Sequence, residues 1–91
     1  MRFEWDADKA AINLAKHGVS FDEACTVFAD PLATSLLDVA HSIDEERWLT
    51  TGHSDQGQLV IVSHTNREGA IRIIGARPAT PRERGIYESG Q

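Results

Sequence analysis

Apolar and polar positions are most clearly ordered in the second half of the chain, where two runs of branched side chains flank a polar turn. Leu59–Val62 and Ile71–Ile74 are rich in Val and Ile, and Asn66–Gly69 between them holds turn-forming residues. Branched side chains fit a pleated, packed surface, and Asn and Gly favour tight turns. The pattern predicts an antiparallel hairpin at the centre of a small sheet.

The first half of the chain predicts one short strand and two helices. Phe3–Trp5 alternates apolar with charged positions, as a strand does. Small apolar residues recur at helical spacing over Ala7–His17, and Gly18 supplies the left-handed residue that ends such a helix. Ser20 opens a capping box for a second helix over Phe21–Ala29. A tight turn therefore joins the two helices.

The remaining segments predict strands and one more helix. Strands are expected at Ala33–Asp38 and Glu46–Gly52, with a turn at His53–Gly57 before the hairpin, and a short basic helix at Arg82–Ser89. The expected order is β-α-α-β-β-β-β-α. It predicts an α+β fold, in which a small antiparallel sheet carries two N-terminal helices on one face and a short C-terminal helix. We expect residues 1–91 to form a single domain.

Charge changes this picture because it is unevenly distributed. The net charge of −5 argues against a nucleic-acid-binding protein. However, residues 1–57 carry four Lys and Arg against eleven Asp and Glu, whereas residues 58–91 carry five Arg against three Glu. The basic charge therefore gathers on the hairpin and the tail, where a local patch can attract an anion. Seven of the nine basic residues are Arg, which binds phosphate through paired hydrogen bonds.

The sequence also bears on where the protein acts. No apolar run approaches the ~20 residues that cross a bilayer, and the N-terminal MRFEWDADK does not resemble a signal peptide. The single cysteine, Cys25, cannot form an intrachain disulfide. We expect a cytoplasmic protein with no membrane association.

Three polar side chains interrupt the apolar pattern of the hairpin. His64 ends its first strand, Arg72 lies inside the second strand, and Arg77 ends it. An Arg between buried Ile residues needs water or a partner, so this sheet face is either solvated or an anion-binding floor. If Thr65 pairs with Ala70, the alternation of side chains along the strands decides which face each of the three occupies. His64 and Arg77 then share one face and Arg72 lies on the other, and a one-residue bulge would change this.

The chain lacks the motifs of common hydrolases and nucleotide-binding proteins. It has no G-x-S-x-G, no Walker loop and no dinucleotide fingerprint, and its four histidines are too far apart in sequence to predict a metal site. We expect no metal and no cofactor. The set His64, Arg72, Arg77 and Arg47 suits phosphodiester cleavage without metal. A His or a carboxylate would move the proton of a ribose 2′-OH, and guanidinium groups would stabilise the developing charge.

Each of these residues also has a purely structural interpretation. His64 can be a hydrogen-bonded residue at a strand end, and the hairpin arginines can be solvated. The polar face of the first helix can equally be solvated; it holds Lys9, Asn13, Lys16 and His17. Composition and spacing leave both interpretations open.

A resemblance to a known family favours the functional interpretation. The residues that carry it lie in three stretches: FEWDADKAAINLAKHGVSFDEACTVFADP, HSIDEERWLTTGHSDQGQLVIVSHT and IRIIGARPATPRERGIYES. These stretches, with the pattern NLxKHGVxFxEA in the first, resemble the BrnT-type toxins of bacterial type II toxin–antitoxin systems. The resemblance implies a small ribonuclease with a RelE-like α+β fold, which cleaves RNA and thereby inhibits translation.

The same resemblance implies partners. BrnT-type toxins are neutralised by a co-expressed BrnA-type antitoxin that carries a ribbon-helix-helix DNA-binding segment. We expect a hetero-tetramer of two toxins and two antitoxins, which contacts operator DNA only through the antitoxin, and RNA as the substrate. Because basic side chains gather on the hairpin and the tail, we expect an acidic segment of the antitoxin to cover them.

The polar pattern of the family also implies site residues. The implied catalytic residues are His64, Arg72, Arg77 and Glu46, with the two arginines as phosphate clamp and charge stabiliser and with His64 or Glu46 as the group that moves the proton. The implied RNA-binding residues are Lys9, Asn13, Lys16, His17, Arg47, Arg84 and Tyr87, and Glu83 also matches the pattern.

Two departures from the family pattern favour an alternative function. Pro78 stands where the family often has a charged residue after the strand. Gly85 interrupts a final helix that is usually longer and more basic, and a helical Gly costs about 1 kcal/mol relative to Ala. The alternative is a non-catalytic or weakly active module that binds the antitoxin and acts only as a co-repressor partner.

Overall fold

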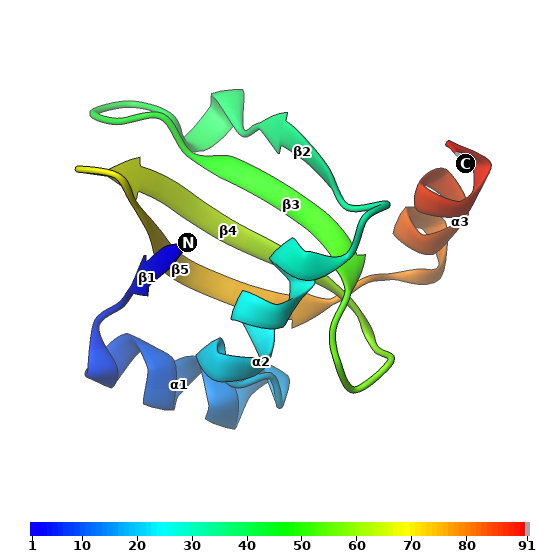
Figure 1. Ribbon diagram of the computed structural model, residues 1–91, viewed down its shortest axis with the longest axis horizontal. Helices are drawn as coiled ribbons and strands as arrows, with labels where there is room; N and C mark the ends of the chain where they lie inside the picture. Colours follow the sequence, from blue (N-terminus) through cyan, green and yellow to red (C-terminus); the bar gives the residue numbers. More distant parts are fainter. Residues whose placement is uncertain (91) are drawn as a thin grey trace.

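The elements follow the order expected from the sequence. The structure is a computed structural model that describes residues 1–90, so Gln91 lies outside the described part of the chain. Figure 1 shows β1 (Arg2–Glu4), α1 (Ala7–His17), α2 (Phe21–Thr26), β2 (Thr34–Leu37), β3 (Trp48–His53), β4 (Leu59–Arg67), β5 (Ala70–Pro78) and α3 (Pro81–Ser89), with 3-10 turns at Val27–Ala29 and Val39–His41. The β-α-α-β-β-β-β-α order and the α+β class are confirmed.

The five strands form one mixed sheet. Their spatial order is β1-β5-β4-β3-β2. The expected antiparallel pairing holds from β2 to β5, whereas β1 runs parallel to β5. A parallel neighbour requires a long crossover, and the whole chain between β1 and β5, including both N-terminal helices, supplies it.

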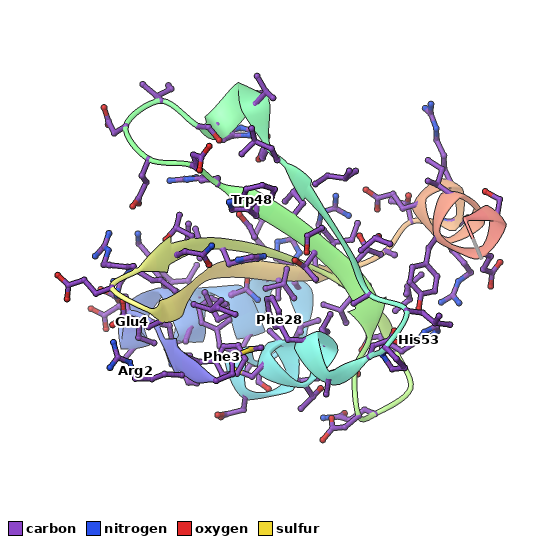
Figure 2. The ribbon with its side chains drawn as sticks, turned by 45° about the horizontal axis from the view of Figure 1, so that its top comes forward. Arg2, Phe3, Glu4, Phe28, Trp48 and His53 are labelled. Atoms are coloured by element: carbon purple, nitrogen blue, oxygen red, sulfur yellow. The ribbon has the colours of Figure 1, made fainter. Side chains whose placement is uncertain are left out.

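The two N-terminal helices lie on one face of the sheet, as predicted (Figure 1). Phe3 of β1 and Phe28 lie together on this covered side, with their ring centroids 5.4 Å apart (Figure 2). The core consists of buried apolar side chains from the helical segment and the central hairpin: Val19, Phe21, Ala24, Val27, Val60, Val62, Ile73 and Ala76. Burial of this set on one side of the sheet defines a covered face and an open face.

A two-residue turn sets the register of the central hairpin. Glu68 and Gly69 both have positive φ, 50° and 81°, which is the backbone geometry of tight hairpin turns. The resulting register places Thr65 opposite Arg72 and not opposite Ala70. The pairing considered from the sequence therefore does not form.

A bulge interrupts this register in the middle of the hairpin. His64 faces Ile73 and Ser63 faces Gly75, so Ile74 is an extra residue on β5. A bulge shifts the alternation of the strand by one position. After Ile74, the side chains of β5 that point to the core are therefore shifted by one position from the alternation that holds before it.

The last helix lies beyond one end of the sheet (Figure 1). Thr80 caps α3, with a complete capping box between Thr80 and Glu83, and Pro81 occupies the start of the helix. The sequence predicted this helix and its cap. The contacts between this helix and the sheet form part of the candidate functional site.

Candidate functional site

Both hairpin arginines point to the open face of the sheet. Ile73 and Ala76 of β5 belong to the core, so Arg72 and Arg77, which are their immediate neighbours, point the other way. In a regular strand, residues five apart lie on opposite faces; the extra residue Ile74 brings these two to the same face. The bulge thus produces an arrangement that a regular strand would not.

His64 lies on the opposite face, inside the core. Its side chain is 5% exposed, its Nε2 hydrogen-bonds Oγ1 of Thr50 at 2.7 Å, and its ring meets Phe28 edge-on at 4.9 Å between centroids. Burial lowers the pKa of His64 to about 4, so its imidazole is neutral at pH 7. The arrangement with His64 and Arg77 on one face was conditional on a strand without a bulge. It does not form, because the extra residue Ile74 moves Arg77 to the face opposite His64.

Arg77 is bound to α3 through a two-point ion pair. Its Nη1 and Nη2 donate to Oε1 and Oε2 of Glu83 at 2.7 and 2.8 Å, and Nη1 also donates to the carbonyl of Pro78 at 3.4 Å. The guanidinium lowers the pKa of Glu83 to about 2, and the carboxylate raises the pKa of Arg77. A guanidinium has five N–H donors. Among the described residues, these contacts leave the Nε hydrogen and one Nη2 hydrogen, which form one edge suited to a two-point contact with an anion.

Arg72 and Arg47 are held differently. Nη1 of Arg72 is 3.8 Å from Oε1 of Glu4, and both side chains are partly exposed. Such a pair contributes at most about 1 kcal/mol, so Arg72 is easily redirected. Arg47 lines a separate hollow of about 270 Å³ with Asp44 and Glu45. The structure therefore does not bring Arg47 together with Arg77.

A small hollow on the open face brings His17 and Arg77 together. Its volume is about 150 Å³, and its lining residues are Asn13, His17, Leu49, Ile61, Ser63, Gly75, Ala76 and Arg77. His17 ends α1 and is half-buried. An imidazole is the side chain that most often acts as a general acid or base in enzymes. The hollow thus combines a proton-transfer group, a guanidinium and the hydroxyl of Ser63.

Asn13 closes the edge of β5 beside this hollow. Its Nδ2 donates to the carbonyls of Ala76 at 2.8 Å and Val19 at 3.0 Å, and the N–H of Ala76 donates to its Oδ1 at 3.1 Å. The side-chain amide therefore makes the same pair of bonds that a neighbouring strand would make. Asn13 was expected to bind RNA, and the structure shows its amide in these buried contacts with the backbone.

The other predicted site residues are dispersed. Lys9 and Lys16 are exposed on α1, and Arg84 is exposed on α3. Glu46 is exposed in the loop before β3, which begins two residues later than predicted. None of these four side chains lines the hollow of Arg77. Their predicted roles in RNA binding and, for Glu46, in proton transfer stay predictions.

A polar cluster that the sequence did not reveal fastens the far end of α3. Oδ2 of Asp30 accepts hydrogen bonds from the hydroxyl of Tyr87 at 2.8 Å and from the backbone N–H of His53 at 2.7 Å. These bonds lower the pKa of Asp30, with the His53 bond as the largest cause, while burial first and Asp30 second raise the pKa of Tyr87 to about 12. Asp30 carried only the signal of a helix end in the sequence. Tyr87, expected to bind RNA, is buried in this cluster.

Two further properties can be stated for the described part of the chain. Within residues 1–90, no group of three or more His, Cys, Asp or Glu side chains is arranged to hold a metal ion. Over the same residues, no helix combines the length and the apolar character needed to cross a membrane.

One protein family matches most of the sequence. The family described as "Ribonuclease toxin, BrnT, of type II toxin-antitoxin system" matches residues 5–83. This chain belongs to the BrnT family. Membership confirms the resemblance seen in the sequence, and it implies ribonuclease activity and a cognate antitoxin.

A solved structure shares the fold. The crystal structure of the Brucella abortus ribonuclease toxin BrnT superposes with a TM-score of 0.68 at 22% sequence identity, and the alignment covers 88% of this chain and 97% of that one. At this identity the similarity establishes the fold. A search of curated proteins finds no match for this chain. The roles of individual residues in this BrnT toxin must therefore be argued from its own geometry.

Proposed function

We propose that this BrnT toxin cleaves RNA without a metal ion on the open face of its sheet, and that it thereby inhibits translation in the cytoplasm. One domain over residues 1–91 would carry the activity. The reaction is the attack of a ribose 2′-OH on the adjacent phosphate, which breaks the bond from phosphorus to the 5′-oxygen and leaves a 2′,3′-cyclic phosphate and a 5′-OH. It needs a group that takes the proton of the 2′-OH, a proton for the departing 5′-oxygen, and a positive charge to stabilise the transition state. The observation that carries the proposal is the shared hollow of His17 and Arg77.

The roles follow from what each side chain can still do. Arg77 stabilises the negative charge, because the Nε edge of its guanidinium remains open to an anion while Glu83 fixes its position. His17 moves the proton, because it is half-buried at the edge of the same hollow. Arg72 lies five residues earlier on the same face, roughly 15 Å away at ~3.3 Å per residue, and binds a neighbouring phosphate.

His64 has no part in this proposal. A neutral imidazole in the core cannot reach a phosphate on the opposite face of the sheet without unfolding the hairpin. Glu46 is likewise left out, because it is exposed in a loop and does not line the hollow of Arg77. Lys9, Lys16, Arg47 and Arg84 remain candidates for weaker, non-specific contacts with the RNA backbone.

The proposed partner is a BrnA-type antitoxin with a ribbon-helix-helix segment. Two toxins and two antitoxins would form the complex, and the antitoxin alone would contact operator DNA. Family membership supports a cognate antitoxin; its type and the stoichiometry are part of the proposal.

One observation favours the alternative, a binding module with little or no catalysis. Several guanidiniums are engaged with carboxylates of the same chain: Arg67 with Glu45, Arg72 with Glu4, Arg77 with Glu83 and Arg84 with Glu88. A guanidinium paired in this way attracts RNA less strongly than a free one. Catalysis would then have to rely on the open edge of Arg77.

The end chemistry of the RNA products tests the proposal. A defined RNA would be incubated with the purified toxin in excess EDTA, and the cleaved ends would be analysed by mass spectrometry. We expect 2′,3′-cyclic phosphate ends, with cleavage unaffected by EDTA and slowed by about 10²- to 10³-fold in Arg77→Ala. Products with 5′-phosphate ends, or cleavage that EDTA stops, would refute the metal-free mechanism, and no cleavage at all would favour the binding module.

A further inference from the structure

Exposed apolar side chains are concentrated around β2, the outer strand of the sheet. Among residues 1–90, nine large apolar side chains are exposed, and an even distribution would place about one of them in any twelve-residue segment. Five lie between residues 32 and 43: Leu32, Leu36, Leu37, Val39 and Ile43. Leu36 is 71%, Val39 77% and Ile43 86% exposed. Leu36 and Leu37 alternate between the two faces of the sheet, so the outer strand exposes apolar side chains on both of its sides, where another molecule can cover them.

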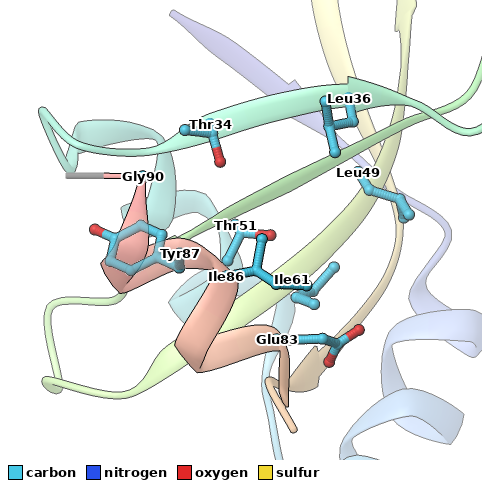
Figure 3. Close-up of a pocket in the computed structure, with 9 residues that line it drawn as sticks. All are labelled: Thr34, Leu36, Leu49, Thr51, Ile61, Glu83, Ile86, Tyr87 and Gly90. Atoms are coloured by element: carbon cyan, nitrogen blue, oxygen red, sulfur yellow. The ribbon is translucent and has the colours of Figure 1, made fainter. Parts of the chain in front are cut away.

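A groove adjoins this cluster on the open face of the sheet. It has a volume of about 360 Å³, and Figure 3 shows Leu36 of β2, Leu49 of β3 and Ile61 of β4 facing Ile86 of α3 across it. Glu83 and Tyr87, which fasten α3 to the rest of the fold, lie along the same groove. The groove wall is therefore held in place at two points.

The backbone edge of β2 is also available. Within the described residues, β2 pairs only with β3, and all four of its residues are exposed. Natural edge strands are often very short, as β2 is with four residues, and many also carry Lys, Pro, a bulge or an inward charge that prevents pairing with another chain. The sequence Thr34-Ser35-Leu36-Leu37 has none of these side chains, and its pairing with β3 is regular. On the other side of the sheet β1 is the edge strand, and β1 and Asn13 together bond along the outer side of β5.

The charge of this region selects the kind of occupant. Residues 30–46 contain five of the 14 acidic residues and none of the nine Lys and Arg: Asp30, Asp38, Asp44, Glu45 and Glu46. The rest of the chain is balanced, with nine residues of each sign, so the whole net charge of −5 lies here. Asp30 is bonded to Tyr87 and Glu45 is paired with Arg67, so the exposed carboxylates of Asp44 and Glu46 are the ones that can attract a basic polypeptide.

We propose that the outer edge of β2 and the adjoining groove bind an extended segment of the cognate antitoxin that is both apolar and basic. The segment adds a sixth strand beside β2, its apolar side chains cover Leu36 and enter the groove, and its basic side chains meet the acidic loop at 38–46. The inference rests on the proposed function only in requiring an antitoxin. It replaces the expectation of an acidic antitoxin segment over the basic hairpin.

An occupant of the groove would also explain neutralisation. Leu49 and Ile61 line both the groove and the hollow of His17 and Arg77. An antitoxin side chain that fills the groove therefore lies against the wall of the proposed cleavage site. Access of RNA to Arg77 would be blocked without any contact between the antitoxin and the arginine.

The affinity of the toxin for the full-length antitoxin encoded beside it tests this surface. Leu36→Glu and Val39→Glu each place a charge on the apolar edge, and both positions are exposed, so the fold should persist. We expect each variant to weaken binding by about 30-fold or more in calorimetry. Leu14→Glu, an exposed position on α1, is the matched control and should bind as the unmodified toxin does. Asp44→Lys should weaken binding most at low salt, and its control Asp22→Lys should not.

RNA cleavage by each variant, measured without antitoxin, separates this inference from the proposed function. Weakened binding with unchanged cleavage supports the β2 surface, and weakened binding by a toxin that never cleaves RNA supports it while refuting the proposed cleavage. Unchanged affinity in Leu36→Glu and Val39→Glu overturns the inference. The inference is also overturned if the toxin alone forms a dimer that Leu36→Glu dissociates while the affinity for the antitoxin is unchanged. The edge of β2 would then bind a second copy of the toxin.

Discussion

The two faces of the sheet place the same kind of side chain in opposite surroundings. On the covered face, His64 lies against Phe28 and Thr50, and burial lowers its pKa to about 4. On the open face, His17 lines a hollow with the guanidinium of Arg77. In the proposed mechanism, the face of the sheet, and not closeness along the sequence to the hairpin arginines, therefore decides which histidine acts on a phosphate.

The largest expected effect comes from removing the charge on the open face. Arg77→Ala should lower the rate of RNA cleavage by about 10²- to 10³-fold, because a positioned donor to the developing negative charge is lost. The measurement is the single-turnover rate on a defined RNA, with circular dichroism to confirm the fold.

A matched variant distinguishes catalysis from attachment of α3. Glu83→Gln removes the charge from the same ion pair and leaves the guanidinium in place. We expect its cleavage rate to stay within about threefold of the unmodified toxin. An equal loss in both variants would mean that cleavage needs the intact ion pair between Arg77 and Glu83 and not the open edge of the guanidinium alone.

The next largest effect is expected on stability, at the edge of β5 that Asn13 covers. Asn13→Ala removes two bonds donated to carbonyls and leaves the N–H of Ala76 without its acceptor. We expect the free energy of unfolding to fall by about 2–4 kcal/mol, because each lost bond contributes about 1 kcal/mol and a buried unpaired group costs more. Urea denaturation measures this free energy of unfolding. The control Lys16→Ala, at an exposed position on the same helix, should change the free energy of unfolding by less than about 0.5 kcal/mol.

The covered face should make stability depend on pH. His64 titrates near 6.5 when unfolded and near 4 when folded, so between these values the unfolded chain binds more protons. Stability should therefore fall by about 2 kcal/mol as pH decreases from 6.5 to 4. In His64→Gln the part of this decrease between about pH 6.5 and 5 should be absent, and a slope that persists there would assign it to other groups. The contribution of Glu83, whose pKa is lowered from 4.5 to about 2, is lost as pH decreases from about 4.5 toward 2.

The smallest effect is expected at the far end of the open face. Arg72 is only loosely paired with Glu4, at 3.8 Å, and lies away from the hollow of Arg77. Arg72→Ala should raise KM by about 3- to 10-fold and change kcat little, because a phosphate contact outside the reacting centre contributes to binding alone. A loss confined to kcat would instead place Arg72 at the reaction.

Local sequence signals predicted the order of elements well. Gly18 and the Ser20 cap fixed the ends of the helices, and the two Val- and Ile-rich runs gave the central hairpin. These features depend on short-range steric and hydrogen-bonding preferences that the residues themselves carry. The parallel partner of β1 was not predictable in this way, because it depends on where a distant strand lies.

The site was harder to predict because it depends on one residue of register. The bulge at Ile74 decides that Arg72 and Arg77 share a face and that Arg77 lies on the face opposite His64. Gly75 is the kind of residue that accompanies a bulge, but it does not show which of its neighbours is the extra one. Asn13 and Tyr87 looked like polar surface residues of helices, and only the tertiary structure shows their contacts with Ala76 and Asp30.

The most direct test compares the two histidines in one assay. The single-turnover rate of cleavage of a defined RNA would be measured for His17→Gln and His64→Gln, at a temperature well below the melting point of both variants. The account predicts a loss of about 10²-fold or more in His17→Gln and a change within about threefold in His64→Gln. Full activity in His17→Gln with a large loss in His64→Gln would contradict it.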